Sequence, residues 1–174
     1  MNKIPILGIA AGIVGLLLIF KKKQKYIVIG DSQTPYIANA SKKYKLLNAQ
    51  PGVGSLWLGG VGVNWLTEAL KKQKPQYNVG GVAISIGTNG GFNVNDKISN
   101  LFTELKRVFP LAKFYAVPGS WGWGGNRNLT TYNVLSYYQL FKPYAKVLQT
   151  PIGAQDPHAN LPVYKTIAAE LDNL

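Results

Sequence analysis

Two residues far apart in the sequence could carry out nucleophilic chemistry together. Ser32 ends a Gly30-Asp31-Ser32 turn that follows the apolar run 26–29, and His158 is the single histidine of the chain. A serine hydroxyl is a poor nucleophile until a base accepts its proton, and an imidazole can do this near neutral pH. Serine–histidine chemistry in this protein therefore requires these two residues to meet.

The elements that must position these residues alternate between apolar strands and helices. Strands are predicted at residues 26–29, 45–47, 81–86, 113–117 and 146–148, and helices at residues 34–43, 64–72, 94–109, 131–141 and 162–171. This alternation is typical of a parallel sheet covered on both faces, which binds ligands at the carboxyl ends of its strands. We therefore expect four turns to converge at that edge, namely residues 30–32, 59–62, 87–89 and 156–158.

The four turns resemble the sequence blocks of the SGNH (GDSL-like) hydrolases, a family of esterases and lipases. The resemblance covers residues 26–174 and implies a flavodoxin-like, three-layer α/β/α fold with a five-stranded parallel sheet. It also implies that Ser32 is the nucleophile and His158 its base. The backbone amides of Ser32 and Gly62 and the side-chain amide of Asn89 would bind the oxyanion. The residues after the histidine fit the family's last block, namely Asn160, Tyr164, Ile167 and Ala168.

The sequence departs from the family pattern at two positions. Gly90 stands where the third block has an aspartate. The aspartate expected three residues before the histidine is Gln155 here, and Asp156 comes one residue later. Asp156 could orient His158 only if the loop shifts by one residue. Otherwise Gln155 or a backbone carbonyl would orient the ring, and the site would be a dyad.

Each of these residues also has a purely structural interpretation, which leaves three functions open, two on this fold and a third as a binder of nucleic acid or a lipid surface driven by charge. Ser32 could cap the following helix, Asn89 could be a turn residue and His158 an ordinary loop histidine. The first function is a serine esterase that removes an acyl group, such as acetyl, from a glycan, peptidoglycan or lipid. The alternative is a catalytically inactive SGNH-like fold that serves as a binding or structural part of a membrane-associated assembly, including a viral one.

A glycine-rich segment with two tryptophans follows the predicted strand 113–117. Its candidate substrate-binding residues are Trp121, Trp123 and Arg127. Flexible glycines beside exposed tryptophans suit a sugar-binding lip or a mobile lid. The alternative is a loop whose tryptophans pack on the domain or lie in a membrane interface.

Residues 1–25 are predicted to form a membrane anchor with a basic flank, ahead of the domain at 26–174. Residues 4–20 carry no charge, and as a helix these residues would span roughly 26 Å. A cleaved signal peptide is the competing interpretation, but the heavier lysine cluster follows the apolar run. Those lysines predict that the domain lies on the cytoplasmic or inner side of the membrane, close to its headgroups. Gly8 and Gly12 match the small-xxx-small pattern of helix dimerisation, so an oligomer is a further hypothesis.

The composition limits the remaining classes of function. The net charge of +12 favours anionic partners, but the chain shows neither an arginine-rich stripe nor an aromatic RNA-binding motif, which argues against nucleic acid. The chain contains no cysteine, so disulfides and thiolate metal sites are excluded, and its single histidine argues against a structural zinc site. We expect neither a metal nor another cofactor.

Overall fold

A computed structural model describes residues 24–47, 55–154 and 158–174 of the chain. The predicted membrane span at residues 4–20, its Gly8 and Gly12, and the candidate histidine partners Gln155 and Asp156 lie outside the described residues. Within these described ranges, no helix is both long enough and apolar enough to cross a membrane.

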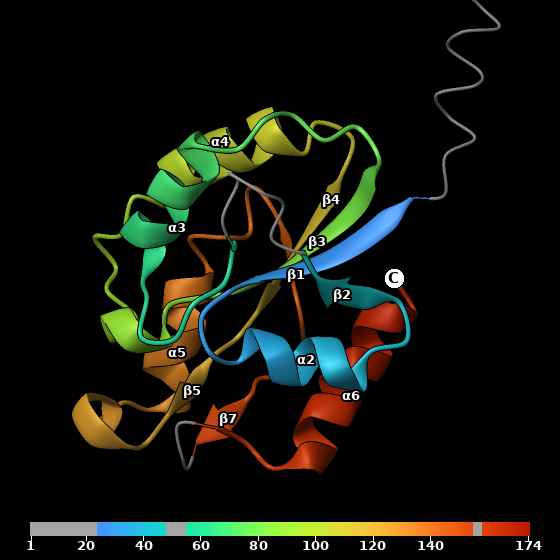
Figure 1. The fold of residues 1–174 in the computed structure, drawn as a ribbon. Coiled ribbons are helices and arrows are strands. Elements are labelled where there is room, and N and C mark those ends of the chain that lie inside the picture. Colours follow the sequence, from blue (N-terminus) through green and yellow to red (C-terminus); the bar gives the residue numbers. More distant parts are fainter. Residues whose placement is uncertain (1–23, 48–54, 155–157) are drawn as a thin grey trace, which may run out of the picture.

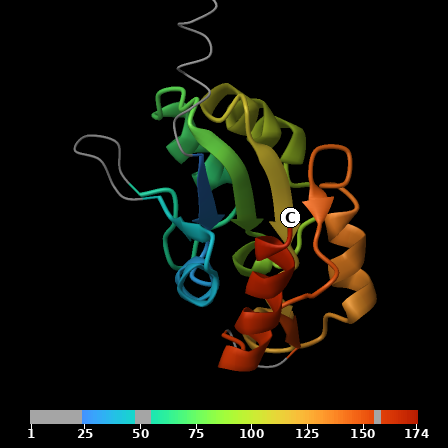
Figure 2. The ribbon, with the colours of Figure 1, turned by 90° about the vertical axis from the view of Figure 1, so that its right-hand side faces the viewer.

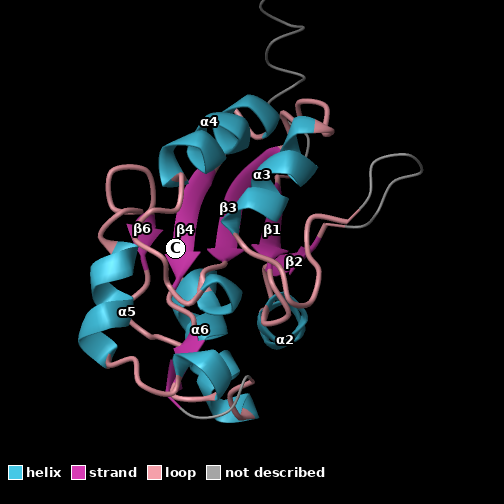
Figure 3. Ribbon diagram, turned by 90° about the vertical axis from the view of Figure 1, so that its left-hand side faces the viewer, coloured by secondary structure: helices cyan, strands magenta, loops and turns pink. Residues whose placement is uncertain are grey.

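Five parallel strands form the central sheet of the domain (Figure 1). In chain order they are β1 (Lys25–Gly30), β2 (Tyr44–Leu46), β3 (Val79–Ser85), β4 (Lys113–Val117) and β6 (Lys146–Val147). Their spatial order is β2-β1-β3-β4-β6, and the arrows of the long strands point the same way in Figures 2 and 3. This is the order of flavodoxin-like sheets, so the predicted fold class of the domain is confirmed.

Helices cover both faces of the sheet and bury two separate apolar cores. On one face lie α2 (Thr34–Ala40) and α6 (Leu161–Asp172), and on the other lie α3 (Val63–Lys71), α4 (Ile98–Val108) and α5 (Thr131–Tyr138) (Figure 1). Because successive side chains of a strand point to opposite faces, Ile27 and Ile29 pack under α3 and α4, and Val28 packs under α2 and α6. The sheet is therefore buried on both sides, as its apolar strands predict.

Some predicted boundaries are wrong for local reasons. The helix predicted to end at Lys43 ends at Ala40, because the Ser41 hydroxyl accepts the N–H groups of Lys43 and Tyr44 at 3.1 and 2.7 Å and turns the chain into β2. The helix predicted from Val94 begins at Ile98. The residues before it form a turn in which the Asp96 N–H donates to the Asn93 carbonyl at 2.9 Å.

A second, two-stranded sheet was not predicted. It pairs β5 (Ser120–Trp121) in parallel with β7 (Gly153–Ala154), just beyond the ends of β4 and β6. Each strand has only two residues, so the sequence carries no alternating pattern that could reveal it. This small sheet fixes the start of the tryptophan-containing segment, which continues through the short 3₁₀ helix η2 (Gly124–Asn126).

Candidate active site

Ser32 stands in a tight turn at the carboxyl end of β1. Gly30 has φ of +127°, and a Cβ atom there would lie 1.8 Å from the Ser85 carbonyl oxygen, so only glycine fits. The Asp31 N–H donates to that same carbonyl at 2.8 Å, and the Gly30 N–H donates to the Leu56 carbonyl at 3.0 Å. Backbone hydrogen bonds to two neighbouring segments therefore fix the turn that carries Ser32.

The side chain of Asp31 stabilises this turn. Its side chain is fully buried, and its Oδ1 accepts the N–H of Gln33 at 3.1 Å and the hydroxyl of Ser85 at 3.2 Å. Its Oδ2 is buried without a hydrogen-bond partner among the described residues. Burial, only partly offset by these hydrogen bonds, raises the pKa of Asp31 to about 7. Asp31 therefore ties the turn to β3.

His158 and Ser32 meet across the carboxyl edge, although 126 positions separate them in the sequence. His158 Nε2 lies 3.0 Å from Ser32 Oγ. This is hydrogen-bond distance for a hydroxyl that donates to a neutral imidazole nitrogen. The chain thus brings together the two side chains on which serine–histidine chemistry depends, whereas the side chains before His158 lie outside the described residues.

Two tyrosines, one on α2 and one on α6, support the loop that carries the imidazole. The Tyr36 ring lies 4.9 Å from the His158 ring at a 36° tilt, and stacks on Tyr164 at 5.1 Å and 17°. The Tyr164 hydroxyl accepts the Ala159 N–H at 3.2 Å and donates to the Gln33 side-chain oxygen. The loop that carries His158 is thereby joined to the residue after Ser32.

The sequence pointed to only part of this support. Tyr164 fits the last block of the family, but Tyr36 and Gln33 were missed. A signal for Tyr36 was available, because it lies four residues after Ser32 and would share a face with it in a helix.

The candidate oxyanion donors lie on two loops beside Ser32. Asn89, in the 3₁₀ helix η1 (Thr88–Gly90), donates its side-chain N–H to the Val61 carbonyl at 3.1 Å. Val61 precedes Gly62, which is the N-cap residue of α3. A Cβ atom on Gly59 would lie 4.0 Å from Ser32 Cβ, so this loop passes next to the serine. The loop at residues 59–62 and Asn89 therefore meet near the hydroxyl.

The backbone around these donors leaves N–H groups for a ligand. Among the hydrogen bonds of the described residues, the backbone N–H groups of Ser32 and Gly62 have no protein acceptor. The Asn89 amide carries two hydrogens, of which the contact with Val61 uses one. These three groups are the ones that the resemblance assigns to the oxyanion.

The tryptophan-containing segment lies at the same edge of the sheet. Its three candidate substrate-binding residues differ in their exposure to solvent. Trp121 is 5% exposed and packs in the core under α5, so it is a structural residue. Trp123 is half-buried, and its indole N–H donates to the Ser120 hydroxyl at 3.2 Å. That hydroxyl also accepts the Gln33 side-chain N–H at 3.3 Å. Arg127 is exposed, and its side chain donates to the Gly124 carbonyl at 3.1 Å.

In the part of the chain that the structure describes, no group of three or more His, Cys, Asp or Glu side chains could hold a metal ion. The polar groups around Ser32 are instead hydroxyls, amides and one imidazole. Such a set can transfer protons and donate hydrogen bonds to a developing negative charge.

Comparison with known proteins identifies the fold. No protein-family model matches the chain, and no curated protein matches it. Among solved structures, a Streptococcus pneumonia protein provisionally described as a platelet activating factor is similar, with 14% identity over 95% of this chain and 98% of that chain, at a TM-score of 0.59.

Two carbohydrate esterases share the same fold. One is the family 2 carbohydrate esterase of Corynascus thermopiles, which carries an added carbohydrate-binding domain (13% identity, 87% of this chain and 65% of that chain, TM-score 0.58). The other is the acetylxylan esterase Axe2 of Geobacillus stearothermophilus (12% identity, 85% and 92%, TM-score 0.55). At these identities the likeness shows the fold alone, an α/β fold that this chain shares with carbohydrate esterases.

Proposed function

We propose that this protein is an SGNH-type serine esterase in which Ser32 is the nucleophile and His158 the general base. The observation that carries the proposal is the 3.0 Å contact between Ser32 Oγ and His158 Nε2. The contact joins the first and last of the matched sequence blocks at the ligand-binding edge of the sheet. An esterase-like fold supports the reaction class independently of those two residues.

The reaction follows from the positions of these groups. Ser32 Oγ attacks the ester carbonyl carbon while its proton passes to His158 Nε2. The carbonyl oxygen becomes an oxyanion, which the N–H groups of Ser32, Gly62 and Asn89 stabilise. The imidazolium then protonates the departing alcohol and leaves an acyl-serine. Water, deprotonated by the same imidazole, attacks the acyl carbon, and the proton returns to Ser32 as the acid departs.

The oxyanion donors should supply much of the rate acceleration. One such donor is typically worth about 3–4 kcal/mol of transition-state stabilisation. Asn89 is fixed by its hydrogen bond to the Val61 carbonyl, so its second N–H points in one direction at little entropic cost. We infer that this bond orients the amide before the substrate arrives.

The substrate that fits this proposal is a small acyl ester, such as acetyl, on a glycan or peptidoglycan. The esterase neighbours include enzymes named for carbohydrate and acetylxylan esters. Trp123 and Arg127 would face such a sugar from the segment beside the site, whereas Trp121 supports that segment from the core. We further propose that residues 1–25 anchor the esterase to a membrane as a single-pass protein.

A fluorophosphonate probe tests the nucleophile directly. We expect labelling of Ser32 in the wild-type protein and none in Ser32→Ala, while Ser136→Ala on α5 should label normally. Hydrolysis of p-nitrophenyl acetate should fall at least about 1,000-fold in both Ser32→Ala and His158→Ala. Absence of both labelling and turnover in folded wild-type protein would instead favour the inactive, binding fold.

A further inference from the structure

Lysines and exposed apolar side chains gather at the amino edge of the sheet, opposite the candidate active site. The turn before β4 exposes Leu111 (47%), and the turn before β3 exposes Tyr77 (61%). Exposed leucine and tyrosine side chains beside lysines suit an amphipathic interface. We name this region the amino-edge surface, and its residues are Lys74, Tyr77, Lys106, Leu111, Lys113, Lys142 and Lys146.

An open depression of about 700 Å³ lies in the amino-edge surface. Its apolar floor includes Phe114 and Tyr144. Among the described residues, the ion pairs that form are Lys71–Glu68 and Arg107–Glu104, so no carboxylate neutralises the lysines of the depression. The lysines that line it are Lys106, Lys113, Lys142 and Lys146.

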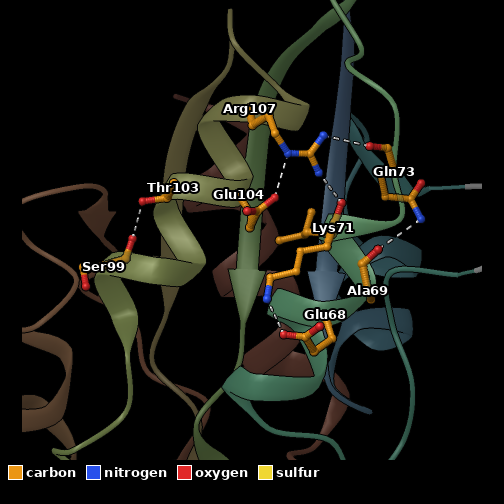
Figure 4. A network of polar contacts seen from close by, with 9 residues as sticks. Glu68, Ala69, Lys71, Gln73, Ser99, Thr103, Glu104 and Arg107 are labelled. Atoms are coloured by element: carbon orange, nitrogen blue, oxygen red, sulfur yellow. Dashed lines mark hydrogen bonds and ion pairs between the residues drawn. The ribbon is translucent and has the colours of Figure 1, made fainter.

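Arg107 holds the turns of this surface in place (Figure 4). Its guanidinium donates to the carbonyls of Gln73 and Leu70 at 3.0 and 2.7 Å, and its Nε donates to Glu104 at 2.7 Å. The Gln76 N–H also donates to the Val108 carbonyl at 2.7 Å. The ends of α3 and α4 are therefore tied together, and the Glu104 charge is already paired.

We propose that the amino-edge surface docks on a bilayer that contains anionic lipids. Lysine ammonium groups bind headgroup phosphates, and leucine and tyrosine at turn tips fit the boundary between headgroups and acyl chains. β1 begins at this same edge, directly after the basic flank of the predicted membrane anchor. A nucleic acid would match the charge, but it would leave the apolar side chain of Leu111 uncovered.

Docking in this way would turn the candidate active site away from the bilayer. β3 has seven residues, which separate the two edges by roughly 23 Å. If the proposed esterase function is correct, a docked domain hydrolyses esters presented from the solvent side, such as those of a glycan, and the lipid esters of its own bilayer stay out of reach.

A fluorescent probe on the full chain tests the docking. The chain has no cysteine, so Leu111→Cys and Tyr132→Cys can each be labelled at one position with an environment-sensitive nitrobenzoxadiazole dye. Tyr132 is 78% exposed at the start of α5, towards the carboxyl edge. With equimolar phosphatidylglycerol–phosphatidylcholine vesicles, the dye at position 111 should shift to shorter wavelength and be quenched by doxyl-labelled lipid. The dye at position 132 should not respond.

Charge variants separate docking from insertion of residues 4–20. Lys113→Gln combined with Lys146→Gln should lower the ratio of docked to undocked domain about 25-fold, since each juxtamembrane lysine is worth roughly fivefold. Lys97→Gln combined with Lys165→Gln removes the same charge elsewhere and should change nothing. With pure phosphatidylcholine vesicles, the dye at position 111 of the chain without charge substitutions should respond as weakly as it does in the Lys113→Gln, Lys146→Gln variant with anionic vesicles.

Three results would overturn the proposal. The first is that the dye at position 111 does not respond to anionic vesicles, whether the chain floats with these vesicles or does not bind them. The second is an equal response at positions 111 and 132. The third is a response at position 111 to double-stranded DNA and not to vesicles. None of these measurements depends on turnover, so failure here and failure of the esterase proposal are distinguishable.

Discussion

The nucleophile turn (residues 30–32) and the histidine loop (residues 158–160) meet at one hydrogen bond, but different contacts hold them. The nucleophile turn is bound through its backbone to the Ser85 and Leu56 carbonyls, and it contains a glycine with φ of +127°. The histidine loop is held mainly by side chains: the ring of Tyr36 and the hydroxyl of Tyr164.

Because different contacts hold the two segments, changes in one should affect mainly the stability of the domain and changes in the other mainly its activity. A change in the nucleophile turn disturbs β1 and β3, the central strands of the sheet, so it should destabilise the whole domain. A change at the exposed Tyr36 should reach mainly the orientation of the imidazole, so it should reduce turnover in a domain that stays folded. The following predictions test this contrast, from the largest expected effect to the smallest.

Gly30→Ala should have the largest effect. Its Cβ atom would lie 1.8 Å from the Ser85 carbonyl oxygen, and φ of +127° is unfavourable for alanine. We expect the free energy of unfolding in urea to fall by about 4 kcal/mol or more. Gly62→Ala is the matched control, because its φ is −118° and no atom lies within 4 Å of the added Cβ. Equal losses in both variants would show that the nucleophile turn is not specially constrained.

The buried Asp31 should make the nucleophile turn sensitive to pH. Burial raises its pKa from 3.8 to about 7, so the folded state favours the neutral acid. Its contribution to stability is therefore full below pH 4 and is lost as the pH rises through 7. The free energy of unfolding should fall by up to about 4 kcal/mol across this range, and Asp31→Asn should flatten that fall.

Asp172 provides a control of opposite sign. Burial opposes its ionisation, but hydrogen bonds from Ser41 and from the backbone of Lys42 and Lys43 lower its pKa. Its contribution is present at neutral pH and is lost as the pH falls. Urea denaturation over a pH series should therefore show both differences at neutral pH but with opposite signs, with Asp31→Asn more stable than the wild type and Asp172→Asn less stable. Matching pH profiles for the two variants would argue against the buried-acid assignment of Asp31.

Tyr36 should affect activity without affecting stability. The side chain is 45% exposed, so Tyr36→Leu should change the free energy of unfolding by no more than about 0.5 kcal/mol. Loss of the ring beside His158 should lower kcat about fivefold with little change in KM, because the imidazole loses a contact of roughly 1 kcal/mol. Tyr36→Phe should restore kcat, and Tyr132→Leu should leave it unchanged. A variant whose kcat stays at the wild-type value would remove Tyr36 from the site.

The sequence predicted the nucleophile turn better than the support of the histidine loop. Apolar β-branched strands and glycine turns are local signals, so the sheet and the approach of Ser32 to His158 could be anticipated. The stacking of Tyr36 depends on how α2 packs on α6, which the sequence pattern of one helix does not contain. The same holds for β5 and β7, whose two-residue strands pair only because the ends of β4 and β6 bring them together.

The burial of Asp31 could not be predicted from the residues next to it in the sequence. The Asp31 side chain is buried, and its Oδ1 accepts the Ser85 hydroxyl. Only the register of β1 against β3, which pairs Gly30 with Ser85, brings this hydroxyl to it. Sequence reasoning thus identified the reacting atoms, whereas the groups that hold them come from tertiary contacts.

The smallest effect is expected where the histidine loop enters α6. Asn160 caps this helix, because its side-chain oxygen accepts the Val163 N–H at 3.4 Å. Asn160→Ala should lower the free energy of unfolding by about 1 kcal/mol, and Asn160→Ser should recover most of it. Asn173→Ala, at the other end of the helix, should change it by less. If Asn160→Ala also lowered kcat more than Tyr36→Leu does, the helix cap rather than the ring stack would be the main support of His158.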